Sequence, residues 1–189
     1  MARGRKAGAA IKCITSRDLE LMTGIAKTGL TSYYDAIQTI GLSEKRLKNL
    51  EKEGYISSKN VLIKGNDIFK TYCLNSKGKT YIKINTDIDK FYRSNERQVE
   101  HDLKLSSIYY RLERDERKTW TNENDLIDSY KLNHPGKKLK TMVDATYSST
   151  NGCLVAVEVI TRNYTKEQIQ EKYKIAEQLG CTEVLKINA

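Results

Sequence analysis

The sequence predicts a mixed α and β protein in two parts: helices followed by a β-hairpin, and then a compact unit of alternating helices and strands. Helical periodicity dominates the chain as far as Gly54, after which β-rich runs appear on either side of a Gly-Asn-Asp turn at 65–67. The second half holds a long helix, two apolar strands, another helix and a final strand. This order is typical of an α/β unit.

The net charge of +9 is confined to the first half of the chain. Residues 1–94 contain 18 Lys and Arg against 9 Asp and Glu, whereas residues 95–189 contain 15 of each. Basic surfaces also arise for solubility alone, but so complete an asymmetry favours an anionic polymer as partner. We therefore expect the protein to bind double-stranded DNA.

The composition also indicates where the protein works. No apolar run approaches the ~20 residues that cross a bilayer, and MARGRKAGAA has no apolar signal core. We expect a soluble, cytoplasmic protein without a membrane partner. The four cysteines are scattered, with no spacing that indicates zinc or a disulfide framework, and are expected to be reduced.

Three helices are expected before the hairpin. The first begins at a capping Thr15 or Ser16 and ends at Gly29. The second extends from about Thr31 to Thr39. The third extends from Ser43 to Glu53 and is the basic one.

Helix, helix, helix and hairpin, with LEKEGYI before the hairpin and LNSKGKTYI after it, resemble a winged helix-turn-helix domain over residues 14–85. We expect this DNA-binding domain to cover residues 14–90 and to follow a basic tail at 1–13. The resemblance makes the third helix the recognition helix. Its Leu47 and Leu50 face inward, so the polar residues on its other side are free to contact phosphates or base edges.

The predicted DNA contacts come from the third helix, the hairpin and the tail. They are Lys45, Arg46, Lys48, Asn49 and Lys52 on the helix, Lys64 and Lys70 on the hairpin, and Arg3 and Arg5 in the tail. Winged helices also bind proteins, and a lysine-rich exposed helix is common, so a protein-interaction module without DNA affinity stays open.

A long helix is expected from about Ser94 or Asn95 through RQVEHDLKLSSIYYRLERDE. His101 falls in an apolar row of this helix, where a histidine is usually a satisfied core residue. Its neighbour Glu100 makes a functional role equally plausible.

Two acidic residues lie near the ends of the strands of one predicted hairpin, Leu139–Tyr147 and Cys153–Ile160. Asp144 belongs to the first strand and Glu158 to the second, in the run LVAVEVI. A carboxylate is costly to bury in so apolar a run unless it meets solvent or holds a cation. A capping box at Thr165 then opens the last helix, and a right-handed crossover places the final strand parallel to the Glu158 strand.

This succession is similar to the restriction-endonuclease-like fold of the PD-(D/E)XK superfamily, which we expect over residues 95–189. The resemblance implies that Glu100, Asp144 and Glu158 hold Mg²⁺ or Mn²⁺ for DNA cleavage. One departure matters: Ile160 stands where the superfamily has a lysine that orients water and stabilises charge. The candidates to replace it are Arg162, Lys172 and Lys174, with Gln168 or Gln170 as weaker polar substitutes.

Taken whole, the chain resembles the replication-relaxation family of plasmids and mobile elements. The matching positions are EHDL, VDAT, VEV and EKYK, with His101, Asp144, Glu158 and Lys172 among them. The resemblance implies a DNA-binding protein of plasmid, phage or other mobile-element replication or transfer, whose nuclease-like domain cuts or nicks DNA. His101 would then support the site or handle protons.

Alternatives remain within and outside this interpretation. The nuclease fold is either active or catalytically silent, serving as a platform for DNA binding, dimerisation or regulation. A homodimer and a protein partner in a replication or transfer complex are both possible. The twelve tyrosines suggest a transesterification nucleophile only weakly, because they lie in ordinary strand and helix patterns.

Overall fold

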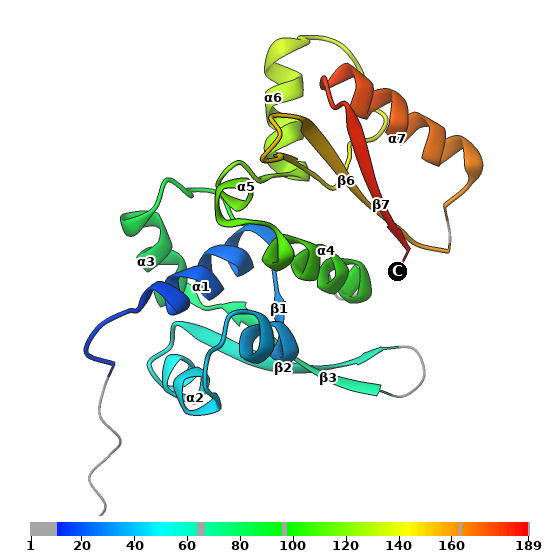
Figure 1. Cartoon of the computed structure of the whole chain (residues 1–189). Coiled ribbons are helices and arrows are strands. Elements are labelled where there is room, and N and C mark those ends of the chain that lie inside the picture. The colour runs from blue at the N-terminus through cyan, green and yellow to red at the C-terminus, as the bar shows by residue number, and fades with distance from the viewer. Residues whose placement is uncertain (1–10, 64–66, 96–97, 163, 189) are drawn as a thin grey trace, which may run out of the picture.

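The computed structural model describes residues 11–63, 67–95, 98–162 and 164–188, which form a mixed α and β fold (Figure 1). One sheet is antiparallel with strand order β1-β3-β2, and the other is mixed with strand order β4-β5-β6-β7. None of the helices in these ranges is both long and apolar enough to span a membrane.

The first half contains helices around the three-stranded sheet. Its elements are α1 (Ser16–Thr28), β1 (Thr31–Ser32), the π-helix η1 (Asp35–Thr39), α2 (Glu44–Lys52), β2 (Ile56–Ile63), β3 (Asp67–Leu74) and α3 (Ser76–Asn85). The predicted hairpin is confirmed, since β2 and β3 pair along their whole length from Ile56 with Leu74 to Ile63 with Asp67. Most of its predicted turn lies outside the described residues.

The second half begins with helices and ends with the mixed sheet. Its elements are α4 (Val99–Arg111), α5 (Arg114–Lys118), β4 (Thr121–Asn122), α6 (Glu123–Asn133), β5 (Ala145–Ser148), β6 (Leu154–Ile160), α7 (Lys166–Gln178) and β7 (Glu183–Asn188). As predicted, β7 returns parallel to β6 after the α7 crossover.

Local signals in the sequence set several of these boundaries. Thr15 and Asp18 form the capping box that starts α1, and Gly29 ends the helix with φ of 85°. Thr165 starts α7 through the predicted capping box with Gln168. Ser43 caps α2 by accepting a hydrogen bond from the Arg46 backbone N–H.

The predicted second helix is wrong at its start. Thr31 and Ser32 are extended and pair with Tyr72 and Thr71 of β3, and the chain becomes helical only from Tyr33 onward, just before η1. Thr31 is fully buried, and its hydroxyl contacts the Tyr110 phenol at 2.7 Å. Contacts with distant parts of the chain therefore outweigh the local helical pattern.

Two boundaries in the second half also differ from expectation. The long helix starts at Val99 rather than near Ser94, and it ends at Arg111 because Leu112 is extended before α5 begins. The first strand of the acidic hairpin covers only Ala145–Ser148 instead of Leu139–Tyr147. Asp144 therefore lies directly before the strand.

Helix α4 lies between the first half and the mixed sheet (Figure 1). Tyr110 of α4 packs against Gly24 of α1, where a Cβ would lie 2.1 Å from the phenol oxygen. The same phenol donates a hydrogen bond to the Leu21 carbonyl. One apolar core consequently continues from α1 through α4 to Val157 of β6.

The mixed sheet is covered on both faces. Val155, Val157 and Val159 belong to the core shared with α4. Ala156, between them, belongs to a second cluster with Ala176 of α7. Since side chains alternate along a strand, Glu158 is directed to the same side as Ala156, toward α7.

Candidate functional site

The two acidic strand residues lie side by side at one end of the mixed sheet. Ala145 pairs with Val157, so Asp144 lies beside Glu158 where β5 begins. The Val159 backbone N–H donates to Oδ2 of Asp144 at 2.7 Å. Both carboxylates are buried, with 5% of Asp144 and 3% of Glu158 exposed.

One cation reaches these carboxylates from each side of the sheet. Lys172 of α7 places Nζ 2.9 Å from Oε1 of Glu158 and 3.7 Å from Oδ1 of Asp144. His101 of α4 places Nε2 3.0 Å from Oδ2 of Asp144. The structure thus brings together four of the predicted catalytic residues.

Asp102 is a fifth member that sequence reasoning missed. It is fully buried, and its Oδ1 lies 3.0 Å from Nδ1 of His101. We refer to His101, Asp102, Asp144, Glu158 and Lys172 as the buried cluster. The sequence signal for Asp102 was weak because neighbouring residues of a helix do not normally face each other.

The charges of the buried cluster strongly influence one another. Burial would lower the pKa of His101, but hydrogen bonds to Asp102 and Asp144 outweigh it and raise the pKa to about 10. Burial would likewise lower the pKa of Lys172, but Asp144 and Glu158 raise it above its ordinary value. Both cations are therefore charged at neutral pH.

Glu158 is the member of the buried cluster with the fewest hydrogen-bond partners. Burial, followed by the charge of Asp144, raises the pKa of Glu158 to about 7. Lys172 forms an ion pair with Oε1 of Glu158, and by strict hydrogen-bond geometry neither Glu158 oxygen has a further partner among the described residues. A buried carboxylate that lacks hydrogen bonds can still bind a proton, a water molecule or a cation.

The buried cluster holds three carboxyl groups, one ammonium and one imidazole. If all five groups are charged, one negative charge is unmatched, and it can be balanced by a proton on Glu158 or by an added cation. No group of three or more His, Cys, Asp or Glu side chains within the described ranges is arranged to hold a metal ion. A metal ion held by Asp144, Glu158 and Glu100 stays a prediction.

A polar groove reaches the buried cluster at Lys172. The groove has a volume of about 250 Å³, and its lining includes Glu123, Tyr164, Glu171 and Lys172. Glu123 is a second residue that the sequence reasoning missed. Burial raises the pKa of its carboxyl, which also experiences the charges of Lys172 and Asp144.

The other two predicted catalytic residues are less buried than the members of the buried cluster. Lys174 is exposed on α7, whereas Lys172 is buried two positions earlier. Glu100 is half-buried in the first turn of α4, directly before His101. Of the two lysine candidates, Lys172 is the one that contacts Asp144 and Glu158 in the described part of the chain.

In the first half, α2 presents a basic outer surface. Leu47 and Leu50 are buried as predicted, while Lys45, Lys48 and Lys52 are exposed. The remaining predicted contacts differ in their surroundings. Asn49 is half-buried, Lys70 lies 5.3 Å from the centre of the Tyr72 ring, and Lys64, Arg3 and Arg5 lie outside the described residues.

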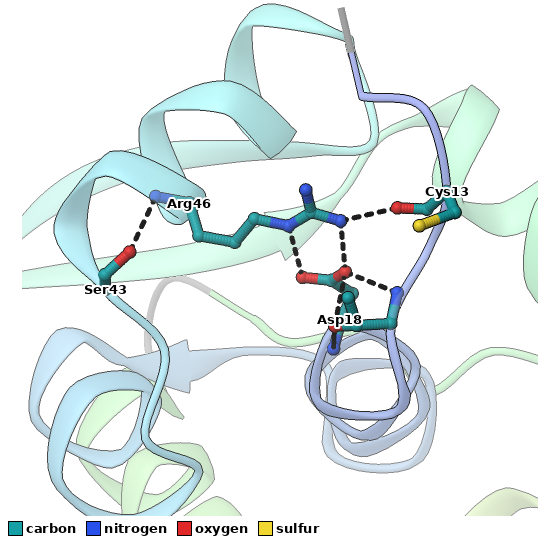
Figure 2. A network of polar contacts seen from close by, with 5 residues as sticks. Cys13, Asp18, Ser43 and Arg46 are labelled. Atoms are coloured by element: carbon teal, nitrogen blue, oxygen red, sulfur yellow. Dashed lines mark hydrogen bonds and ion pairs between the residues drawn. The ribbon is translucent and has the colours of Figure 1, made fainter.

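Arg46 has a structural contact on this helix. Its guanidinium spans from α2 to Asp18 of α1, with Nε 2.9 Å from Oδ1, and it also donates to the Cys13 carbonyl at 2.7 Å (Figure 2). Burial would raise the pKa of Asp18, but Arg46 and Thr15 lower it below its ordinary value. The ion pair joins the starts of α1 and α2, and a DNA contact by Arg46 stays a prediction.

Comparison with known proteins adds no relative from which a role could be transferred. The chain matches no protein-family model, no curated protein and no solved structure.

Proposed function

We propose that the protein binds double-stranded DNA through its first half and that its second half is a nuclease-like domain that cuts or nicks DNA with Mg²⁺ or Mn²⁺. The observation that carries this proposal is the grouping of Asp144, Glu158 and Lys172 at the end of the sheet where β5 begins and β6 nears its last residue. Two carboxylates and one cation from different elements form a setting suited to phosphodiester chemistry. The parallel return of β7 agrees with the resemblance to the endonuclease-like fold.

The donor chemistry of the buried cluster fits a hard divalent cation. Asp144 and Glu158 would hold it, because carboxylate oxygens are the ligands that Mg²⁺ prefers, usually one or two of them with water and phosphate. The two buried Glu158 oxygens, for which no hydrogen-bond partner is found among the described residues, support this assignment. When bound, such an ion supplies an activated water and offsets charge on the phosphate.

The protein's own residues have separate tasks in this proposal. Lys172 neutralises charge beside the scissile phosphate, in place of the lysine that Ile160 replaces. His101 keeps the Asp144 carboxylate in position from the opposite face of the sheet. The groove lined by Lys172 would bring the substrate to this side of the buried cluster.

A DNA-binding protein without cleavage activity is the second candidate. It is favoured by the same Lys172 contact, because an ammonium 2.9 Å from Glu158 already satisfies part of the charge that a metal ion would balance. In that case the buried cluster stabilises a platform for DNA binding or dimerisation, and the predicted contacts of the first half hold the duplex.

Incubation with supercoiled plasmid in Mg²⁺, Mn²⁺ or EDTA separates the two candidates. Nicking and gel shift are measured in the same samples for the native protein, Glu158→Gln and the control Glu171→Gln. Glu171 lines the same groove but pairs with Lys140 at its rim. Metal-dependent nicking that only Glu158→Gln abolishes supports the nuclease. A shift without nicking supports the silent candidate, and no shift with any sample contradicts both.

A further inference from the structure

Asp102 is held from several directions although no solvent reaches it. Its Oδ1 accepts a hydrogen bond from the Tyr92 hydroxyl at 3.4 Å and contacts Nδ1 of His101 at 3.0 Å. Its Oδ2 accepts a hydrogen bond from the Ser94 hydroxyl. A fully buried carboxylate with this many partners has a fixed position.

His101 is bound at both ring nitrogens. Asp102 occupies Nδ1, and Asp144 occupies Nε2 at the same distance of 3.0 Å. The ring cannot rotate without breaking one of these contacts. Carboxylate, imidazole and carboxylate therefore form a continuous chain from Asp102 to the residue predicted to act in the site.

We infer that Asp102 is a positioning residue, which sets the orientation of His101 and through it the orientation of Asp144. This inference rests on the proposed function for its catalytic consequence, but not for its geometry. Outer residues that orient a ligand or a catalytic group typically contribute 10- to 100-fold to metal affinity or activity.

The segment before α4, which joins the two halves, donates hydrogen bonds to Asp102 through Tyr92 and Ser94. Tyr92 and Ser94 precede α4, and the Tyr92 backbone N–H donates to the Ala26 carbonyl of α1 at 2.9 Å. Gly29, at the end of α1, lies so close that a Cβ there would be 2.8 Å from the Ser94 backbone nitrogen. The orientation of the buried cluster thus depends on contacts that reach back to α1.

The test uses a spectroscopic signal that is independent of catalysis. The chain has two histidines, so ¹⁵N-histidine NMR of the full-length protein gives two ring patterns, and His134→Gln assigns them. In the native protein we expect both ring N–H groups of His101 to be visible because both are buried and hydrogen-bonded. Asp102→Ala should shift the His101 pattern and remove the Nδ1–H signal.

The same variants are then assayed for plasmid nicking. Asp102→Ala and the isosteric Asp102→Asn should lower kcat by about 10- to 100-fold with little change in KM. Ser94→Ala, which keeps the carboxylate and removes one hydrogen bond, keeps the test decisive if Asp102→Ala fails to fold, and it should shift the His101 signals in the same direction by less. Asp115→Asn, an exposed aspartate paired with Lys118, is the control and should change neither readout.

Different results would contradict the nuclease proposal and the inference about Asp102. Native His101 signals without any nicking would contradict the nuclease proposal and leave the positioning of His101 supported. Unchanged His101 signals in folded Asp102→Asn and Ser94→Ala would overturn the inference, whatever the activity of the native protein.

Discussion

Lys172 lies on α7 with 8% of its surface exposed, between the carboxylates of Asp144 and Glu158. Its ammonium also donates to the Met142 carbonyl. Burying an ammonium is costly, and these contacts offset the cost only together. Removing Lys172 leaves two carboxylates facing each other without a nearby ammonium.

The variant Lys172→Met should therefore be destabilised by about 3 kcal/mol, since breaking a buried ion pair leaves an uncompensated charge. Urea unfolding at neutral pH measures this change. The control Lys174→Met, on the exposed side of α7, should stay within about 0.5 kcal/mol of the native protein. Equal unfolding midpoints for the two variants would show that the Lys172 side chain is not a buried, charged ammonium.

Residues of the site differed in how well the sequence predicted them. Asp144 and Glu158 stood out because each interrupts an apolar strand, and Lys172 followed from the missing lysine. Asp102 and Glu123 did not stand out. Asp102 belongs to the site because the His101 ring is oriented toward it and because Ser94, eight positions earlier, donates to it. Glu123 belongs to the groove because the start of α6 lies near Lys172 of α7. Periodicity and spacing contain no information about either relation.

At the scale of elements, α2 presents three exposed lysines on the side opposite Leu47 and Leu50. If these lysines contact phosphates, each releases counterions on binding. The triple variant Lys45→Gln, Lys48→Gln, Lys52→Gln should lower DNA affinity and reduce the slope of log K against log salt by about 2.7. Fluorescence anisotropy with a duplex at several salt concentrations measures both quantities.

A control must change the net charge equally. Lys131, Lys137 and Lys138 are exposed in the second half, so replacing these three with Gln removes the same charge at another place. The control should keep the native salt slope. The same slope in both triple variants would mean that α2 does not contact the duplex.

Elements with strong local signals were predicted, and so was the parallel pairing of β7 with β6, but the short strand β1 was not. Thr15 and Gly29 mark the two ends of α1, and the capping box at Thr165 marks the start of α7. By contrast, β1 exists because it pairs with β3, some 40 positions later in the chain. The stretch before Asp144 has a strand-like sequence, but β5 starts only at Ala145. Propensity alone could not predict either result.

At the scale of the whole molecule, buried tyrosines connect the two halves. Tyr72 of β3, Tyr109 and Tyr110 belong to the same apolar core. Burial raises the pKa of Tyr72 to about 12 and raises the pKa values of Tyr109 and Tyr110 above the ordinary value of 10.0. The folded protein therefore retains phenol protons that the unfolded chain releases.

Stability should consequently decrease as pH rises. Between pH 10 and 12 the folded state binds more protons than the unfolded state, so the free energy of unfolding falls with increasing pH. Denaturant unfolding at stepped pH measures the slope, which should be smaller for Tyr72→Phe. The variant Tyr34→Phe removes a phenol that is 65% exposed and should leave the slope unchanged. A free energy of unfolding that does not change with pH up to pH 12 would contradict the burial of these phenols.

The close packing of Tyr110 on Gly24 has a consequence for how such a chain evolves. A bulkier residue at position 24 requires a smaller one at 110, although the two positions lie in different halves. Recombination that exchanged one half alone would join an α1 and an α4 that had never been selected together. The two halves are therefore expected to be inherited as a pair, with substitutions at positions 24 and 110 correlated among descendants.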